Sequence, residues 1–287
     1  MIDRIAILGT GLLGTSVGLA LRAAGYRGSI VGWNRSTEGG KAALSLGAID
    51  SIASDPIEAA KQSQVILLTV PIYATLDWME QLSPVLGPDH LVTDVGSTKE
   101  KITEAAGRLF NTPEKAAFLP GHPMAGKERG GAELGDATLF RGAVWLFTGD
   151  PSWQRSKTGS ELVTGWQEWI AAMGARIINI DAGRHDEMVA WVSHLPQFTA
   201  TALSALLEDE VGDATELRDV GGRALREMTR LGASPFSMWR DIAHTNTAAI
   251  ERALFALEQR LAHLRENLRT PGLRQEFEKA NDFRKDF

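Results

Sequence analysis

One short stretch near the N-terminus decides the fold class: Ile5-Ala6-Ile7-Leu8-Gly9-Thr10-Gly11-Leu12-Leu13-Gly14. It is a G-x-G-x-x-G motif that follows an apolar strand pattern and opens a helical one. The first glycine of such a loop permits a tight turn, the second lets a pyrophosphate approach the backbone, and the third lets helix and strand pack closely. The helix N-terminus adds free N–H groups and partial positive charge. The stretch predicts a dinucleotide site; the alternative is a glycine turn that binds nothing. The residues expected to bind are Gly9, Gly11, Leu12, Leu13 and Gly14.

The end of the second predicted strand indicates which dinucleotide is bound. It reads Gly32-Trp33-Asn34-Arg35-Ser36-Thr37. An NAD-binding chain carries an acidic residue here for the ribose 2′-hydroxyl, and Asn34 stands in its place. Arg35 can pair with a 2′-phosphate and Ser36 can donate to it, so the pattern favours NADP over NAD. The alternative is that Arg35 is a solvated loop residue that only stacks on adenine. The other residues expected at the cofactor are Thr69, Pro71 and Ser97.

Strands and helices alternate through the first part of the chain. Several strand patterns are apolar at consecutive positions, as in strands that are buried on both faces. The alternation predicts a parallel sheet covered by helices. Strands are expected at Arg4–Leu8, Ser29–Trp33, Val65–Val70, Leu91–Val95, Ala117–Leu119, Val144–Thr148 and Ile177–Ile180. The helices expected between them include Ser16–Ala24, Pro56–Ser63, Thr75–Leu82 and Lys99–Phe110.

The remainder of the chain is expected to be helical. A length of 287 residues suggests about two domains. We therefore expect an α/β Rossmann-type domain over residues 1–182 and an all-α helical dimerisation domain over residues 183–287, because long amphipathic helices often complete their core across a dimer. The expected helices are Met188–Leu207, Gly222–Leu231, Pro235–Leu268 and Leu273–Asn281.

Composition excludes several classes of function. A net charge of −6 leaves no basic footprint for nucleic acid. The absence of cysteine excludes a disulfide scaffold, a thiolate metal site and a cysteine nucleophile. No apolar run reaches the roughly 18 residues of a membrane span, and no signal-peptide pattern is present, so a cytoplasmic location is expected. No metal site is expected either, since His185, Asp186 and Glu187 are adjacent and do not share a helix face.

Two polar motifs stand at the ends of predicted strands. Asp94-Val95-Gly96-Ser97-Thr98-Lys99 starts a helix, and Pro120-Gly121-His122-Pro123-Met124-Ala125-Gly126 follows the next strand. Ligands of open α/β sheets bind at the carboxyl ends of strands, so Ser97 and His122 are candidate site residues. A histidine between glycine and proline is expected in a defined loop, either as a base or as a structural hydrogen-bonding group.

Three polar side chains of the helical part are also candidates. Pro196 removes an N–H from the helix and bends it, so Ser193 and His194 lie beside a kink. Arg230 lies at the end of the next helix, ahead of Ser234, an expected N-cap. Two of them have a plainer interpretation: His194 as a core histidine, and Arg230 as a solvated charge.

Taken in order, these motifs resemble the prephenate/arogenate dehydrogenase family of tyrosine biosynthesis. The resemblance covers nearly the whole chain. It is carried by Gly9–Gly14, Asp94–Lys99, Gly121–Gly126, Ser193–Pro196, Met228–Arg230 and Ser237–Ile242.

The resemblance implies oxidative decarboxylation of prephenate to 4-hydroxyphenylpyruvate, or of arogenate to tyrosine, with hydride transfer to NAD(P)+. It implies that His122 takes the ring hydroxyl proton, as a neutral imidazole can near pH 7. Ser97 would hydrogen-bond the same hydroxyl and orient the histidine, and Arg230 would bind a substrate carboxylate. The other substrate-pocket residues that it implies are His194, Trp239 and, as a gate, Glu128.

The resemblance also implies a homodimer formed through the helical domain, with a small molecule as substrate and no nucleic-acid or membrane partner. The chain departs from the family at Lys127, where many members carry a small hydroxylated residue. We expect the Lys127 side chain to point into solvent. Both prephenate and arogenate stand as substrates.

Two other functions compete with this one. NADP-dependent β-hydroxyacid dehydrogenases share the Asn-Arg-Ser/Thr pattern, but they use a lysine base on the first long helix of the second domain. No lysine lies between His185 and Leu207. A non-catalytic NADP sensor would keep the glycine loop and Arg35, yet it would not need Ser97, His122 and Arg230 together.

Overall fold

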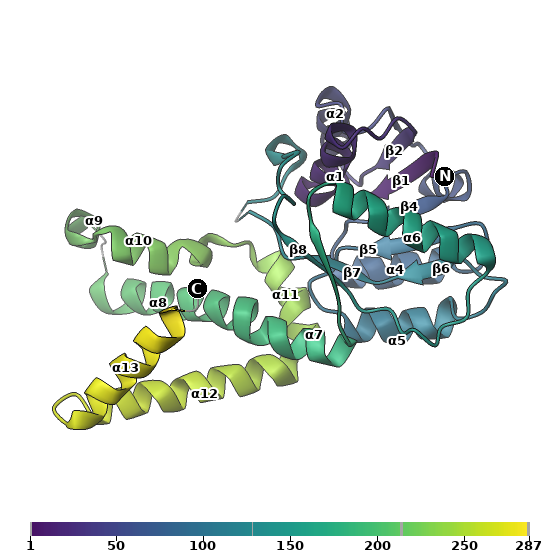
Figure 1. Cartoon of the computed structure of the whole chain (residues 1–287). Helices are drawn as coiled ribbons and strands as arrows, with labels where there is room; N and C mark the ends of the chain where they lie inside the picture. Colours follow the sequence, from purple (N-terminus) through teal and green to yellow (C-terminus); the bar gives the residue numbers. More distant parts are fainter. Residues whose placement is uncertain (1, 128, 213–214, 286–287) are drawn as a thin grey trace. The chain divides into compact units, whose positions relative to one another are not determined.

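The computed structural model describes residues 2–127, 129–212 and 215–285. Figure 1 shows the path of the chain, which forms two compact units. The first unit comprises Met1–Met188 and Ala233–Thr245, and the second comprises Val189–Gly232 and Asn246–Phe287. The single domain boundary expected after residue 182 stays a prediction.

A six-stranded parallel sheet forms the centre of the first unit, in the order β3-β2-β1-β4-β5-β6. The order reverses between β1 and β4, and open α/β sheets bind ligands at such a point. The expected α/β Rossmann-type fold is thereby confirmed. The strands are β1 Arg4–Leu8, β2 Ser29–Trp33, β3 Ser51–Ile52, β4 Val65–Leu68, β5 Leu91–Asp94 and β6 Ala117–Leu119.

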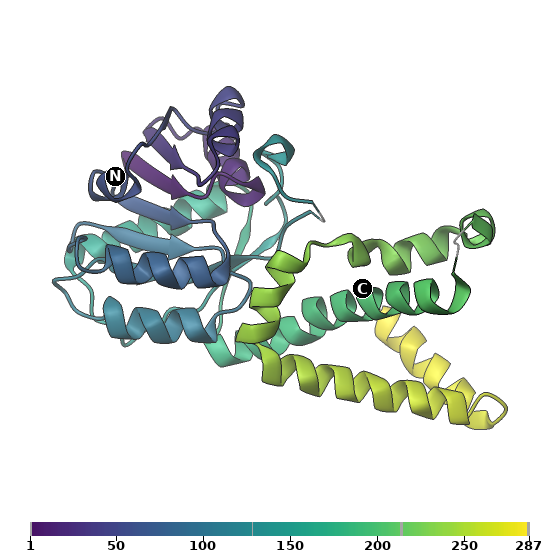
Figure 2. The ribbon, with the colours of Figure 1, turned by 180° about the vertical axis from the view of Figure 1, so that it is seen from behind.

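Helices cover both faces of this sheet. Figure 1 shows α6 in front of the strands, and Figure 2, from behind, shows α4 and α5 on the opposite face. Helices α2 and α6 were not among the expected ones. Each is capped by a serine hydroxyl, Ser36 and Ser156 respectively, which accepts a backbone N–H of the first turn. The helices are α1 Leu12–Ala23, α2 Thr37–Ser45, α3 Pro56–Lys61, α4 Ile72–Leu82, α5 Glu100–Leu109 and α6 Lys157–Ala172.

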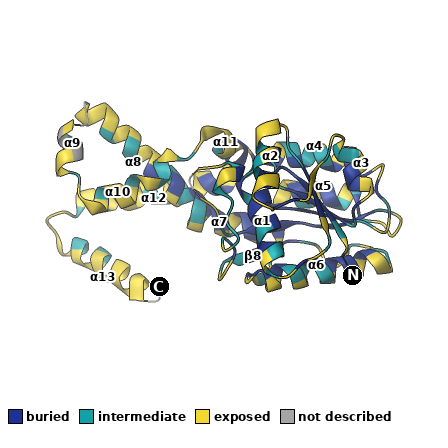
Figure 3. Ribbon diagram, turned by 90° about the horizontal axis from the view of Figure 1, so that it is seen from above, coloured by how far each residue is buried: buried dark blue, intermediate teal, exposed yellow. Residues whose placement is uncertain are grey.

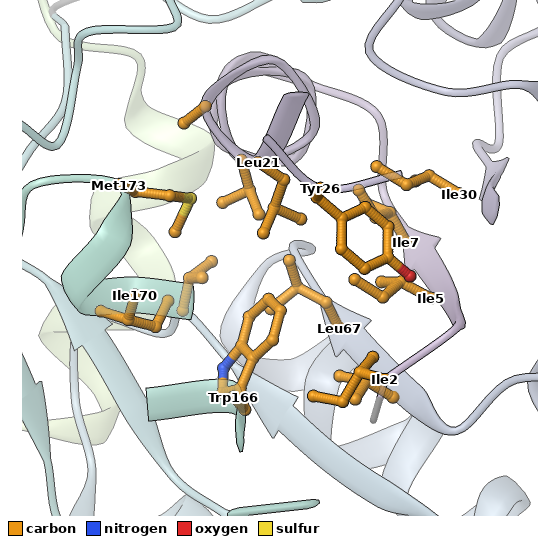
Figure 4. Packing of buried hydrophobic residues seen from close by; sticks show 14 of the residues in the cluster. Ile2, Ile5, Ile7, Leu21, Tyr26, Ile30, Leu67, Trp166, Ile170 and Met173 are labelled. Atoms are coloured by element: carbon orange, nitrogen blue, oxygen red, sulfur yellow. The ribbon is translucent and has the colours of Figure 1, made fainter. Parts of the chain in front are cut away.

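The main hydrophobic core lies on the α1 and α6 face of the sheet. Figure 4 shows Trp166 of α6 and Leu21 of α1 in one cluster with Ile7 and Leu67 from the strands. All four side chains are fully buried, and each such burial stabilises the fold by about 1.5–3 kcal/mol.

A second, three-stranded sheet has the order β7-β8-β9. Its strands are β7 Gly121–Pro123, β8 Val144–Phe147 and β9 Arg176–Asn179. Strand β7 pairs antiparallel with β8, and β9 pairs parallel with β8. The expectation that His122 lies in a loop is wrong, because its backbone is opposite Leu146 in this ladder.

The rest of the chain is helical among the described residues. Figure 3 shows that the helices of the second unit expose much of their surface, whereas β4, β5 and β6 of the first unit are buried. No helix in the described ranges is long and apolar enough to cross a membrane. The helices are α7 Ala182–Val189, α8 Leu195–Val211, α9 Thr215–Val220, α10 Arg223–Thr229, α11 Phe236–Thr245, α12 Thr247–Glu266 and α13 Pro271–Lys285.

Two details of the helical part differ from expectation. The interruption near Pro196 is a π-helical turn over Ala190–His194, a wider turn that is frequent at functional sites. The single helix expected over Pro235–Leu268 is wrong, because α11 ends at Thr245 and α12 begins at Thr247. The break lies at Asn246, whose φ of −133° and ψ of 33° are not helical.

Candidate active site

The glycine loop has the geometry of a dinucleotide cradle. Gly9 adopts a φ of 111°, which favours glycine. A Cβ at Gly14 would overlap the Gly9 carbonyl oxygen, so helix α1 can pack this closely only with glycine there. A Cβ at Gly11, in contrast, would meet no described atom within 4 Å. The loop is therefore open at the one glycine that a pyrophosphate must approach.

The surroundings of this loop also fit a dinucleotide. Gly11 caps α1 without a side-chain hydrogen bond, so no side chain of the cap occupies the first N–H groups of the helix, which begins at Leu12 and Leu13. The Thr69 hydroxyl donates to the carbonyl oxygens of Leu8 and Gly9. Thr69 therefore holds the loop in place, and Pro71 caps α4 beside it. When bound, NAD(P)+ would supply the hydride acceptor at this edge of the sheet.

The loop after β2 carries the residues expected to select the dinucleotide. The Asn34 amide donates to the Ser36 hydroxyl oxygen over 3.1 Å, and this oxygen also accepts the Gly39 N–H over 3.2 Å. Ser36 therefore forms the N-terminal cap of α2, and Arg35 is exposed beside it. A cation and a helix N-terminus thus lie next to each other, as binding of a 2′-phosphate would require.

A buried carboxylate joins the two polar loops of the first unit. Asp94 Oδ2 accepts the Gly96 N–H over 2.7 Å, and Asp94 Oδ1 accepts the Gly121 N–H over 3.0 Å. The same carboxylate forms an ion pair with Lys99, and both side chains are fully buried. Burial lowers the pKa of Lys99, and the Asp94 carboxylate opposes that shift. Half-buried Ser97 lies within this pinned loop, while Gly121 immediately precedes His122.

His122 is one member of a chain of buried side chains. Its Nδ1 lies 2.9 Å from Nε2 of His185, and Nδ1 of His185 lies 2.7 Å from Oδ1 of Asp186. Asp186 also accepts the backbone N–H groups of Lys99 and Glu100, over 2.7 and 3.0 Å. The His122 ring is thus held from β7, from α7 and, through Asp186, from the start of α5.

Sequence reasoning missed four of these residues as parts of the site: Asp94, Lys99, His185 and Asp186. Asp94 and Lys99 are the first and last residues of the Asp94–Lys99 motif. Nothing in that sequence indicates that they form a buried ion pair. The sequence pattern of His185 and Asp186 bears only on metal binding. Their signal was the polar pair His-Asp at the start of a helix, next to apolar positions.

Helix α11 returns to the Ser97 loop within the first unit. The Thr98 and Thr245 hydroxyl oxygens lie 2.7 Å apart in a buried position. The Lys101 ammonium donates to the His244 carbonyl oxygen over 3.3 Å. Trp239, on the same helix, is half-buried. The first unit therefore brings together the loop of Ser97, the strand of His122 and the helix of Trp239.

The second unit holds His194 and Arg230. His194 is buried, and its Nδ1 lies 3.3 Å from the Asn246 amide nitrogen. Gln197, one helical turn beyond His194, donates to the Leu231 carbonyl oxygen over 2.7 Å. This bond holds the segment that begins at exposed Arg230 against α8. His194 and Arg230 are thus parts of one packed helical arrangement.

The Lys127 side chain is exposed, as expected, and it also makes contacts at the surface. Its ammonium donates to the Leu134 carbonyl oxygen over 2.9 Å and lies 3.4 Å from Asp136 Oδ2. Lys127 therefore ties its own segment to the short 3₁₀ turn Ala132–Leu134. Glu128, its expected gating neighbour, lies outside the described residues.

Comparisons with known proteins agree with this architecture. Residues 17–179 match the family model of the prephenate dehydrogenase nucleotide-binding domain. Residues 181–283 match that of the prephenate dehydrogenase dimerization domain. The chain is 30% identical over 255 residues to a prephenate dehydrogenase of Bacillus subtilis, a match that covers 88% of this chain and 67% of that protein. It spans about two thirds of the length of the curated relatives that it matches.

Two solved structures are similar over their whole length. The Aquifex aeolicus prephenate dehydrogenase, in complex with hydroxyphenyl propionate and NAD+, gives a TM-score of 0.84 at 27% identity, over 100% of this chain and 96% of that one. The Synechocystis arogenate dehydrogenase gives a TM-score of 0.77 at 27% identity, over 99% of both chains. The two family models match adjacent segments, residues 17–179 and 181–283, and together they cover most of this chain. The chain therefore belongs to the prephenate dehydrogenase family of NAD(P)-dependent oxidoreductases.

Proposed function

We propose that this chain is a prephenate/arogenate dehydrogenase, which converts prephenate to 4-hydroxyphenylpyruvate or arogenate to tyrosine, with NADP as its preferred cofactor. The observation that carries the proposal is that one buried carboxylate, Asp94, accepts the N–H of Gly96, which precedes Ser97, and of Gly121, which precedes His122. It holds an imidazole and a hydroxyl at the carboxyl ends of β5 and β6, where ligands of such sheets bind.

In this reaction His122 takes the proton of the ring hydroxyl as the carbinol carbon loses its hydride. Ser97 hydrogen-bonds the same oxygen and keeps it facing the imidazole. The C–CO₂ bond then breaks, its electron pair enters the ring, and CO₂ leaves. The ring oxygen takes the proton back from the imidazolium and becomes the phenol, so no net proton is consumed. A neutral imidazole suits both transfers near pH 7.

Two substrate-binding groups of the proposal, Arg230 and His194, belong to the second unit. Arg230 binds a substrate carboxylate, for which the planar guanidinium is suited because it can donate two parallel hydrogen bonds. We assign substrate-binding roles to His194 and Trp239 and a gating role to Glu128, following the resemblance of their motifs to those of the family. The packing of Gln197 against Leu231, which holds the Arg230 segment on α8, supports this assignment.

Initial rates test the proposed function directly. Purified chain is assayed with prephenate and with arogenate, each in the presence of NADP or NAD, and reduced cofactor is followed. We expect turnover with at least one substrate and faster reduction of NADP. Absence of turnover with all four pairs would contradict the proposal. Turnover of a β-hydroxyacid instead would favour the dehydrogenases that share the Asn-Arg-Ser/Thr pattern.

Arg35→Ala is expected to raise the KM for NADP by about 10–100-fold, the loss of one charge-assisted hydrogen bond. The KM for NAD should change little, because NAD lacks the 2′-phosphate. Arg27→Ala, at another exposed arginine of the same unit, is the matched control. An equal rise in KM for both cofactors would show that Arg35 does not bind the 2′-phosphate. NAD, which the Aquifex aeolicus relative binds, would then be the better assignment.

Arg230→Ala is expected to raise the KM for the substrate by about 10–100-fold, because a charge-assisted contact to a carboxylate is lost. The kcat should fall much less. Arg230→Lys should recover only part, since an ammonium cannot form the bidentate pair. Arg226→Ala, one turn earlier on α10, serves as the control. An unchanged KM in Arg230→Ala would show that this guanidinium does not bind the substrate.

We also propose that the second unit forms a homodimer interface. Three large apolar side chains of α12 and α13, Phe255, Leu261 and Phe277, are each more than half exposed. Helices this exposed gain stability by burying such side chains against a second copy. Analytical ultracentrifugation is expected to give twice the 31.1 kDa mass of one chain, and a monomer at micromolar concentration would refute the interface.

A further inference from the structure

A chain of three buried side chains leads away from His122 into the protein. His122 is 8% exposed, His185 is 0% exposed and Asp186 is 2% exposed. The contacts run from His122 Nδ1 to His185 Nε2 over 2.9 Å, and from His185 Nδ1 to Asp186 Oδ1 over 2.7 Å. Neither His185 nor Asp186 takes part in the reaction as proposed above. We therefore ask what these two buried polar groups do to His122, the proposed base.

The Asp186 end of the chain fixes the direction of the hydrogen bonds. Both of its oxygens accept backbone N–H groups, from Lys99 at Oδ1 and from Glu100 at Oδ2. A carboxylate that accepts at both oxygens offers only lone pairs to a third partner. The His185 nitrogen that faces Oδ1 is Nδ1. This nitrogen therefore carries a proton and donates it to Asp186.

The state of His185 then decides the state of His122. Burial lowers the pKa of His185, although the hydrogen bond that His185 donates to the Asp186 carboxylate opposes the shift. The ring is thus neutral at neutral pH, and with its proton on Nδ1 it presents a lone pair at Nε2. The His122 nitrogen opposite that lone pair is Nδ1. A hydrogen bond between the two rings requires His122 to donate from Nδ1.

We infer that His185 and Asp186 fix the tautomer and the ring orientation of His122, so that its Nε2 carries the lone pair that accepts the substrate hydroxyl proton. This inference deepens the proposed function and rests on it for the identity of the substrate. His185 and Asp186 are positioning residues, because they act through His122. The arrangement is similar in logic to the hydrolase triads, in which a buried carboxylate holds a histidine in the tautomer that can accept a proton.

The tautomer can be read without any substrate. The full-length chain contains 6 histidines, few enough for ¹⁵N-histidine labelling and long-range ¹H–¹⁵N NMR spectra at neutral pH. The His122 signals are assigned by their loss in His122→Asn. We expect a protonated Nδ1 and an unprotonated Nε2 for His122, and a protonated Nδ1 for His185. A His122 ring with its proton on Nε2 would overturn the inference.

Two variants of His185 separate positioning from mere packing. His185→Leu removes the acceptor, so nothing holds the His122 proton on Nδ1 and its tautomers mix. His185→Gln keeps an amide oxygen that can accept from His122 and an amide N–H that can donate to Asp186. We expect His185→Leu to lower kcat by about 10–100-fold, as for partners that orient a functional histidine, with little change in KM. His185→Gln should recover most of the kcat and the Nδ1–H signal.

His90→Leu is the matched control, because His90 also bonds to neighbouring groups but lies before β5, at the opposite end of the strand from Ser97. It should leave kcat and the His122 spectrum unchanged. A His185→Leu chain that keeps both full kcat and the Nδ1–H form of His122 would overturn the inference. If the wild-type tautomer is as expected while neither prephenate nor arogenate is turned over, the proposed function is wrong and the tautomer assignment stands.

Discussion

Replacement of His122 by asparagine is expected to lower kcat by about 10²–10⁴-fold, the contribution of a positioned general base. Asparagine has a similar shape and can still donate a hydrogen bond to His185. It cannot take a proton from the ring hydroxyl, because an amide is not basic near pH 7. The substrate KM should change modestly, since the proposed carboxylate contact is made by Arg230 in the second unit. Steady-state rates with the better of the two substrates give both constants.

The control for this variant is His90→Asn, which makes the same change at the far end of the sheet. Circular dichroism and thermal unfolding of both variants establish that the fold is kept. If His122→Asn turns over within about tenfold of the wild-type rate, His122 is not the base. The Ser97 loop would then be the first place to look for the group that accepts the proton.

The variant Lys99→Met is expected to destabilise the fold by about 3–5 kcal/mol, the cost of leaving one charge of a buried ion pair without its partner. Both Lys99 and Asp94 are fully buried, so water cannot replace the missing ammonium. Asp94 keeps the N–H groups of Gly96 and Gly121, which satisfy hydrogen bonds but not the charge. Urea unfolding, monitored by tryptophan fluorescence, measures the loss.

Two further variants make the Lys99 result specific. Lys157→Met removes a lysine whose side chain is 92% exposed in a surface pair with Glu161, and exposed pairs contribute little to stability. The double variant Asp94→Asn/Lys99→Met should lose less than the sum of its single variants, because the unpaired charge is gone. An Lys99→Met chain as stable as Lys157→Met would contradict the role of the buried pair.

The parts of the fold that the sequence predicted well are the ones specified by local pattern. Strands buried on both faces are apolar at consecutive positions, as at every position of Val65–Leu68. The glycine loop combines a positive φ at Gly9 with close packing at Gly14, and each needs glycine for a local reason. Motif order along the chain then pointed to the family, and the comparisons confirm it.

The parts that the sequence did not predict depend on partners distant in the chain. His122 and His185 are 63 positions apart, and only the fold brings their rings together. The strand assignment of His122 required β8 as its ladder partner, 24 positions further along at Leu146. Thr245, the last residue of α11, contacts the Thr98 hydroxyl, which lies 147 positions away in the sequence. A local sequence pattern does not indicate which distant residues will be in contact.

Stoichiometry tests the central claim most directly. Wild-type chain is supplied with excess NADP and a limiting amount of prephenate or arogenate, and both CO₂ and NADPH are measured to completion. Oxidative decarboxylation predicts one CO₂ for each NADPH, since loss of the hydride and loss of the ring carboxylate belong to one reaction. Formation of NADPH without CO₂, or release of CO₂ without NADPH, would contradict it.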